Sequence, residues 1–186
     1  SGSQPPWRPD ALAEAGFGPY RDMLRTILRH AGGVRVDHVL GLFRLWWIPE
    51  GMPAYSGTFV TSDHEALVGI LALEAHRAGA WVVGEDLGTV EQWVKDYLLG
   101  RGILGTGILW FERDYAAHPD TPLPPEQWRA KALASVTVHD LPPSAGYLAG
   151  EHVRIRAELG LLTRSAEDEL ADSNAEIAQW RAMCVD

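Results

Sequence analysis

The sequence predicts an α/β fold built on a parallel sheet, and two observations support that prediction. Short runs rich in Val alternate along the chain with segments of helical apolar spacing, which is the pattern of right-handed βαβ units. Three of these runs end in carboxylates, at Asp37, at Glu85 and Asp86, and at Asp140. A carboxylate beside a core needs water or a partner, so the three endings predict acids collected on one rim of a sheet or barrel, where such folds place their chemistry.

Length and composition fit one well-cored globular domain of 186 residues, with 46% hydrophobic and 22% charged residues. The net charge of −9, with no basic cluster, argues against nucleic acid or an anionic membrane as the main partner. No run approaches the roughly 20 apolar residues of a membrane helix, and no signal-peptide layout opens the chain. Cys184 is the only cysteine, so we expect no internal disulfide and a reducing, cytoplasmic compartment.

The first half of the chain predicts two helices and two strands. In chain order these are an irregular lead-in over 1–19, a helix over 19–30, a strand over 34–37, a broken segment over 43–60, a helix over 64–78 and a strand over 81–83. Asp63 is the expected cap of the helix over 64–78, and Gly79 is its expected end. Because long loops after strand ends build active sites, residues 43–60 are predicted to be an active-site loop.

The second half predicts two more strands and four more helices. In order these are a helix over 90–99, a strand over 105–111, a loop over 112–125, a helix over 125–133, a strand over 135–138, and C-terminal helices within 151–186, over 151–160 and 165–183. Thr89 is the expected cap of the first of these helices. Four strands give either a small open sheet or part of a larger barrel, and no Gly-rich phosphate loop supports a nucleotide-binding sheet.

Carboxylates that converge on one pocket suit glycosidic bond chemistry, because one attacks the anomeric carbon while another protonates the leaving oxygen. Arg35 precedes Asp37 by two residues, so in a strand both side chains point to the same side. His38 and His139 lie beside two of the acids and are candidates for hydrogen bonds to sugar hydroxyls.

Aromatic side chains add a second feature of a sugar site. The chain holds eight tryptophans, and Trp46 and Trp47 follow the first acidic strand end. Tryptophan faces stack on the C–H faces of sugars, although core filling is an equally good role for any single tryptophan.

The same residues also fit structural roles and two further functions. Arg35 and Asp37 fit a structural ion pair, His139 a satisfied histidine at a strand end, and Asp86 a helix cap. One further function is a Mg²⁺-dependent α/β enzyme acting on a phosphorylated metabolite. The second is a non-enzymatic glucan-binding module built on Trp46 and Trp47.

Three segments together resemble the amylomaltases. These enzymes are 4-alpha-glucanotransferases, also called disproportionating enzymes, of glycoside hydrolase family 77 in the α-amylase clan. The segments are VRVDH at 34–38 followed by GLFRLWWIP at 41–49, GEDLG at 84–88, and VHDLP at 138–142 running on to Gly146 and Tyr147. The similarity extends from about residue 7 to about residue 162. The chain departs from the family at Val138, where the family often has Thr.

The resemblance implies a retaining glycosyl transfer between α-1,4-glucans. By that mapping Asp37 is the nucleophile, Glu85 is the general acid/base, and Asp140 stabilises the oxocarbenium-like sugar. Arg35 would keep Asp37 ionised. The 4-hydroxyl of another sugar would intercept a covalent glucosyl-enzyme, and the carboxyls of Asp37 and Glu85 would lie roughly 5–5.5 Å apart. His38, Trp46, Trp47 and His139 would bind sugar, and no metal or organic cofactor is implied.

The resemblance also implies a partial (βα)8 TIM barrel over residues 1–186. The four strands would be barrel strands four to seven, so the chain would be a segment of the catalytic domain of a longer enzyme. We expect the isolated piece to be inactive or nearly so, and its exposed sheet edges to allow self-association. The expected ligands are α-1,4-glucans and maltooligosaccharides.

Overall fold

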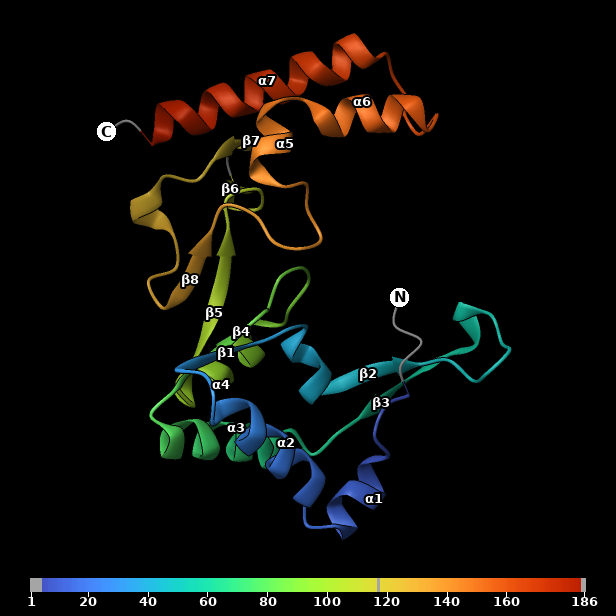
Figure 1. Ribbon diagram of the computed structural model, residues 1–186, viewed down its shortest axis with the longest axis vertical. Helices are drawn as coiled ribbons and strands as arrows, with labels where there is room; N and C mark the ends of the chain where they lie inside the picture. The colour runs from blue at the N-terminus through green and yellow to red at the C-terminus, as the bar shows by residue number, and fades with distance from the viewer. Residues whose placement is uncertain (1–4, 117, 185–186) are drawn as a thin grey trace. The chain divides into compact units, whose positions relative to one another are not determined.

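A computed structural model describes residues 5–116 and 118–184, and Figure 1 shows an alternation of helices and strands along the chain. The helices are α1 Pro9–Glu14, α2 Gly18–Leu28, α3 His64–Ala78, α4 Gln92–Gly100, α5 Ser144–Leu148, α6 Glu151–Glu158 and α7 Ala166–Met183, with 3₁₀ turns η1 Val39–Leu42, η2 Ala54–Ser56 and η3 Pro125–Gln127. The strands are β1 Gly33–Val36, β2 Arg44–Trp47, β3 Thr58–Thr61, β4 Trp81–Gly84, β5 Ile103–Ile108, β6 Arg113–Asp114, β7 His118–Pro122 and β8 Ala132–Ser135.

The chain divides into two compact units. Unit 1 holds the residues up to Thr106 together with Lys131–Leu133, and unit 2 holds Gly107–Ala130 together with the residues from Ala134 on. Each unit has a cluster of buried apolar side chains of its own.

The predicted parallel sheet is confirmed. Its four strands run in the order β1-β4-β5-β8. Val34 of β1 lies opposite Val82 of β4, and Val82 in turn lies opposite Ile103 of β5. The amide of Gly105 donates to the carbonyl of Lys131 beside β8. Because β1 and β4 are parallel neighbours, their carboxyl ends lie at the same edge of the sheet.

The core of unit 1 fixes the sheet against helices α2 and α3. Helix α3 occupies the predicted range, and its ends follow the predicted chemistry. The Asp63 side chain accepts the amide of Ala66, and Gly79 closes the helix in the left-handed region at φ +65°. Buried apolar side chains from α2, α3, α4 and the strands fill the space between them, among them Leu24, Leu28, Val68, Leu71, Val82, Val94 and Ile103.

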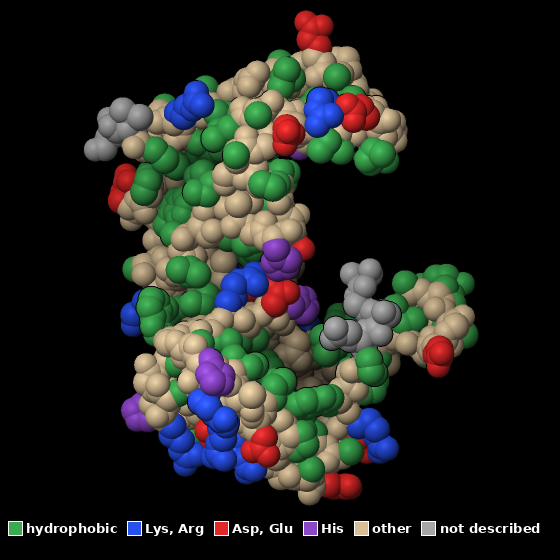
Figure 2. Space-filling model, viewed as in Figure 1, with side chains coloured by type: hydrophobic (Ala, Val, Ile, Leu, Met, Phe, Trp, Pro, Cys, Tyr) green, Lys and Arg blue, Asp and Glu red, His purple; other side chains and the backbone are tan. Residues whose placement is uncertain are grey.

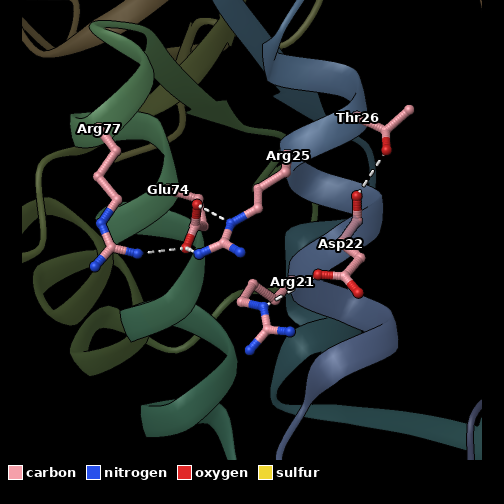
Figure 3. Close-up of polar contacts among 6 residues, drawn as sticks. All are labelled: Arg21, Asp22, Arg25, Thr26, Glu74 and Arg77. Atoms are coloured by element: carbon pink, nitrogen blue, oxygen red, sulfur yellow. Dashed lines mark hydrogen bonds and ion pairs between the residues drawn. The ribbon is translucent and has the colours of Figure 1, made fainter.

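A carboxylate joins α2 to α3 (Figure 3). Both oxygens of Glu74 accept hydrogen bonds from Arg25, at 2.8 and 3.0 Å, and Arg77 donates a third at 3.0 Å. The Glu74 side chain is 5% exposed, while the two arginines reach solvent. The hydrogen bond from Arg25 is the main cause that lowers the pKa of Glu74.

Unit 2 is built around an aromatic cluster. Trp110, Tyr147 and Trp180 lie with their ring centroids 4.3–5.6 Å apart. The Tyr147 hydroxyl donates to Glu176, whose other carboxylate oxygen pairs with Arg113. Burial raises the pKa of Tyr147 to about 12, and the hydrogen bond to Glu176 adds to the effect.

The predicted helix over 125–133 is wrong, and so are the bounds of the strand after it. The chain forms only the 3₁₀ turn η3 there and then enters β8, which ends at Ser135 rather than at Val138. Hydroxyl groups turn the chain away from the strand, because Ser135 Oγ donates to the carbonyl of Thr137 at 2.7 Å, and Thr137 Oγ1 to that of Pro142 at 3.2 Å. Asp140 therefore lies in a loop and not at a strand tip.

Several elements differ more locally from the predicted ones. The lead-in over 1–19 contains helix α1, the segment over 43–60 contains the β2–β3 hairpin, and the loop over 112–125 contains β6 and β7. Strand β5 begins and ends earlier than predicted, α4 begins at Gln92 with Glu91 as its cap instead of Thr89, and α5 is an additional short helix. No helix in the described part of the chain is long and apolar enough to cross a membrane.

Candidate functional site

Asp37 follows β1 directly and lies at the surface. Its Oδ1 pairs with Nη1 of Arg35 at 2.5 Å. The side chain of Asp37 is 58% exposed and that of Arg35 is 30% exposed. The prediction that both side chains leave the strand on the same side is therefore confirmed. The arrangement offers a carboxyl group that is anchored by one oxygen and open to solvent.

Glu85 follows β4 directly and is held by two backbone amides. Its Oε1 accepts the amide of Leu87 at 2.7 Å, and its Oε2 accepts the amide of His38 at 2.9 Å. The Glu85 amide donates to Val36, and the amide of Val39 donates to the Glu85 carbonyl, both at 2.9 Å. The ladder between β1 and β4 thus continues past both strand ends. It fixes the backbone beside Asp37 to the carboxylate of Glu85.

Backbone geometry at His38 permits this contact. His38 has a φ of +48°, in the left-handed region that non-glycine residues rarely adopt. This turn directs Val39 into the core, where it is fully buried. A Cβ at Gly84 would lie 3.1 Å from Val39 Cγ2, which is closer than an ordinary van der Waals contact, so the glycine leaves room for the Val39 side chain. The His38 imidazole itself stays at the surface.

The position of Asp86 before α4 suggests a helix cap, but its side chain makes a different contact. Its side chain is buried, and Oδ1 accepts the amide of Thr106 at 3.1 Å. The Thr106 hydroxyl donates to the carbonyl of Gly84, also at 3.1 Å. Asp86 therefore joins the end of β4 to β5, and Glu91 holds the N-cap position of α4 without a capping hydrogen bond from its side chain.

Asp140 and His139 belong to unit 2 and lie on the loop between β8 and α5. His139 Nε2 is 3.4 Å from Asp140 Oδ1, and both side chains are exposed. The Thr137 hydroxyl, bonded to the carbonyl of Pro142, closes this loop around the pair. Tyr147, on the helix that follows, anchors the next element in the aromatic cluster.

Trp46 and Trp47 point to opposite faces of the β2–β3 hairpin, as neighbours in a strand must. Trp46 is 45% exposed, and its Nε1 donates to the carbonyl of Ala54 at 3.0 Å. Trp47 is half-buried and, with Leu45, lines an apolar cavity of about 310 Å³ in unit 1. The two tryptophans therefore serve separate surfaces.

Sequence reasoning missed Phe59, the cross-strand partner of Trp46. The ring centroids are 4.9 Å apart. Phe59 is 54% exposed. The alternation of Thr58–Thr61 after Gly57 was the available signal, because it marks a return strand for the run that carries Trp46.

Among residues 5–116 and 118–184, no group of three or more His, Cys, Asp or Glu side chains is arranged to hold a metal ion.

These features define a class: α/β proteins that present an arginine-paired aspartate and a tethered glutamate at the ends of adjacent parallel strands. Residues 3–184 match the profile of the Glyco_hydro_77 family, described as 4-alpha-glucanotransferase, and the chain belongs to this family.

Individual relatives agree with the family assignment. A 4-alpha-glucanotransferase of Mycobacterium tuberculosis is 64% identical over 181 residues, which cover 97% of this chain and 25% of the relative. One of Haemophilus influenzae is 35% identical over 85% of this chain and 22% of its own length. The crystal structure of amylomaltase from Corynebacterium glutamicum matches with a TM-score of 0.86 and 55% identity, over 97% of this chain and 25% of that one. The chain thus spans about a quarter of the length of the relatives that it matches.

Proposed function

We propose that this chain supplies the catalytic carboxylates of a retaining 4-alpha-glucanotransferase that acts on α-1,4-glucans and maltooligosaccharides. The observation that supports this most is the pairing of two strand ends. Asp37 with its arginine partner follows β1, while Glu85 follows β4 and binds the amide of His38. Family membership supplies the chemistry that these two carboxylates would perform.

The proposal assigns each acid one role. Asp37 attacks the anomeric carbon to form a covalent glucosyl-enzyme, and Arg35 holds it ionised and oriented. Glu85 first protonates the leaving oxygen and then deprotonates the 4-hydroxyl of an incoming sugar. Asp140 stabilises the distorted, oxocarbenium-like ring. Retention requires a separation of roughly 5–5.5 Å between the carboxyls of Asp37 and Glu85.

Four further residues would bind the glucan. His38 and His139 would donate to sugar hydroxyls. Trp46 would stack on one glucose unit, and Trp47, on the opposite face of the hairpin, would meet a different one. No metal or organic cofactor takes part in this scheme.

The wider proposal concerns the parent protein. Strands β1, β4, β5 and β8 would be strands four to seven of a (βα)8 barrel. The chain alone, with a quarter of the relatives' length, would be inactive or nearly so and would self-associate through its sheet edges. The lone cysteine, Cys184, fits a reducing compartment such as the cytoplasm.

The decisive experiment is Asp37→Asn in the full-length enzyme that carries this chain, with maltotriose as substrate. We expect conversion of maltotriose into glucose and longer maltooligosaccharides to fall at least about 10³-fold, because an amide does not form the glycosyl ester. Asp22→Asn is the matched control, since Asp22 also pairs with a neighbouring arginine, Arg21 at 3.1 Å, but lies on α2. Unchanged turnover in Asp37→Asn would overturn the assignment.

The maltotriose assay also distinguishes the proposed enzyme from the alternative of a non-enzymatic glucan-binding module. A binding module predicts that the wild-type protein binds maltooligosaccharides without converting them, and that Trp46→Ala removes this binding. Transfer by the wild-type protein rules out that alternative.

A further inference from the structure

Beside Trp46, the β2–β3 hairpin carries exposed side chains that the catalytic scheme leaves without a role. Figure 1 shows the hairpin extending from the body of unit 1, and Figure 2 shows hydrophobic side chains on its far end. Trp46 lies opposite Phe59, and Arg44 lies opposite Thr61. Because alternate residues share a face of a strand, Arg44, Trp46 and Phe59 lie on one side of the hairpin.

The indole of Trp46 lies close against the hairpin backbone at Gly57. A Cβ at Gly57 would lie 2.4 Å from Nε1 and 2.7 Å from Cε2 of Trp46, so no other residue type fits under the ring. The hydrogen bond from Nε1 to Ala54 locks the ring in its plane. Trp46 is 45% exposed, so part of this residue remains open to solvent.

Phe59 contacts Trp46 at a steep angle. Its ring plane is inclined by 76° to that of Trp46, so the two rings form a corner rather than a stack. The guanidinium of Arg44 lies 4.9 Å from the centroid of Phe59 and holds that ring in place.

Polar groups border the corner and connect it to the segment that begins at Glu85. Arg44 Nη2 lies 3.6 Å from Glu91 Oε1, and Glu91 Oε2 accepts the indole N–H of Trp93 at 3.0 Å. Glu91 ends the segment that leads from Glu85 into helix α4. The aromatic face is thus continuous with the loop that carries the candidate acid/base.

We propose that Trp46, Phe59 and Arg44 form a subsite for a glucose unit remote from the scissile bond, and that this subsite selects for longer glucan chains. The inference rests on the proposed function. A glucose ring has apolar C–H faces and a hydroxyl rim, which match an open aromatic corner bordered by a guanidinium and a carboxylate. Phe59 is the newly assigned binding residue.

The test compares two exposed aromatic residues of the same hairpin, Phe59→Leu and Tyr55→Leu, in the full-length enzyme. Tyr55 is 86% exposed on η2 and has no role in the proposed subsite. Each variant is combined with Asp37→Asn, and the dissociation constant for maltoheptaose is measured by isothermal titration calorimetry. We expect Phe59→Leu to raise this constant about three- to tenfold, the usual effect of losing one aromatic contact, and Tyr55→Leu to leave it unchanged.

The same substitutions with Asp37 intact show whether the effect depends on chain length. Phe59→Leu should lower kcat/KM for maltoheptaose and leave that for maltotriose close to the wild-type value. Equal values for Phe59→Leu and Tyr55→Leu, in an enzyme that still transfers, would overturn the subsite but not the proposed function. Absence of transfer in the wild-type enzyme would instead overturn the proposed function. If Phe59→Leu unfolds the hairpin, Arg44→Gln keeps both rings and should still raise the maltoheptaose dissociation constant; no change would again contradict the subsite.

Discussion

At the residue scale, the two candidate catalytic acids of unit 1 are held in different ways. Asp37 is anchored through one oxygen to a side chain, whereas both oxygens of Glu85 accept backbone amides. The Arg35 guanidinium orients Asp37 and places a positive charge beside it. Backbone amides orient Glu85 without adding another charged group, which suits a carboxyl that changes protonation state during the reaction.

Replacement of Glu85 by Gln should affect substrates according to their leaving group. Maltotriose needs a proton on its leaving oxygen, so we expect Glu85→Gln to reduce its turnover by at least about 10²-fold. An α-glucosyl fluoride needs little protonation, so rapid fluoride release should persist in a burst equal to the amount of enzyme. Stopped-flow measurement of fluoride checks this, and equal loss on both substrates would contradict the acid role.

Loss of the Arg35 side chain should weaken the nucleophile without removing it. We expect Arg35→Gln to lower kcat about 10²-fold on both maltotriose and glucosyl fluoride, because the charge opposite Asp37 is lost in every step. Arg29→Gln, an exposed arginine at the end of α2, is the control. A normal kcat in Arg35→Gln would show that the contact between Arg35 and Asp37 is only a structural ion pair.

At the element scale, the sequence predictions are accurate for elements whose ends are set by short-range interactions. Helix α3 occupies its predicted range because Asp63 and Gly79 mark both ends by short-range bonds. The stretch over 125–133 forms only the turn η3 at its start, and its last two residues enter β8, which neighbours β5 in the sheet; there a tertiary pairing overrides local helix propensity. The contacts of Glu85 with His38 also lie beyond sequence reasoning, because they join residues 47 positions apart.

The loop that carries Asp140 depends on the hydroxyl of Thr137. We expect Thr137→Val to lower kcat of the full-length enzyme about tenfold or more with little change in KM, because the loop is no longer closed onto Pro142. Thr137→Ser keeps the hydroxyl and should restore kcat. Equal kcat values in the two variants would show that this hydrogen bond does not position the loop.

The Glu74 contact between α2 and α3 should make stability depend on pH in the acid range. The pKa of Glu74 is lowered in the folded chain. The stability that the ionised Glu74 contributes is therefore fully present above the pKa of the unfolded chain, about 4.3, and is lost as the pH falls through the lower pKa of the folded chain. Because its arginine partners reach solvent, we expect Glu74→Gln to cost about 1 kcal/mol at neutral pH and less at low pH.

Urea unfolding at pH 7 and pH 3 measures this difference. Glu50→Gln, at an exposed position in the hairpin, is the control. A destabilisation by Glu74→Gln that is the same at both pH values would contradict the ion-pair account.

At the scale of the whole molecule, the sheet order accounts for the proposed dependence on a longer protein. Strands β1 and β8 are the outer strands of the four-stranded sheet, and each has a neighbour on only one side within it. Unpaired strand edges are templates for further strands. We expect the 186-residue chain, prepared alone, to sediment as concentration-dependent oligomers in analytical ultracentrifugation and to show no transfer. A stable, active monomer would contradict this expectation.

In the proposed mechanism, Asp37 becomes covalently attached to glucose. The most direct test is to incubate the full-length enzyme with 5-fluoro-α-glucosyl fluoride, which forms a glycosyl-enzyme that breaks down slowly, and then to analyse the peptides by mass spectrometry. We expect one added fluoroglucosyl group on the peptide that contains Asp37, and none in Asp37→Asn. An adduct on Glu85, or an equal adduct in Asp37→Asn, would contradict the assignment of the nucleophile.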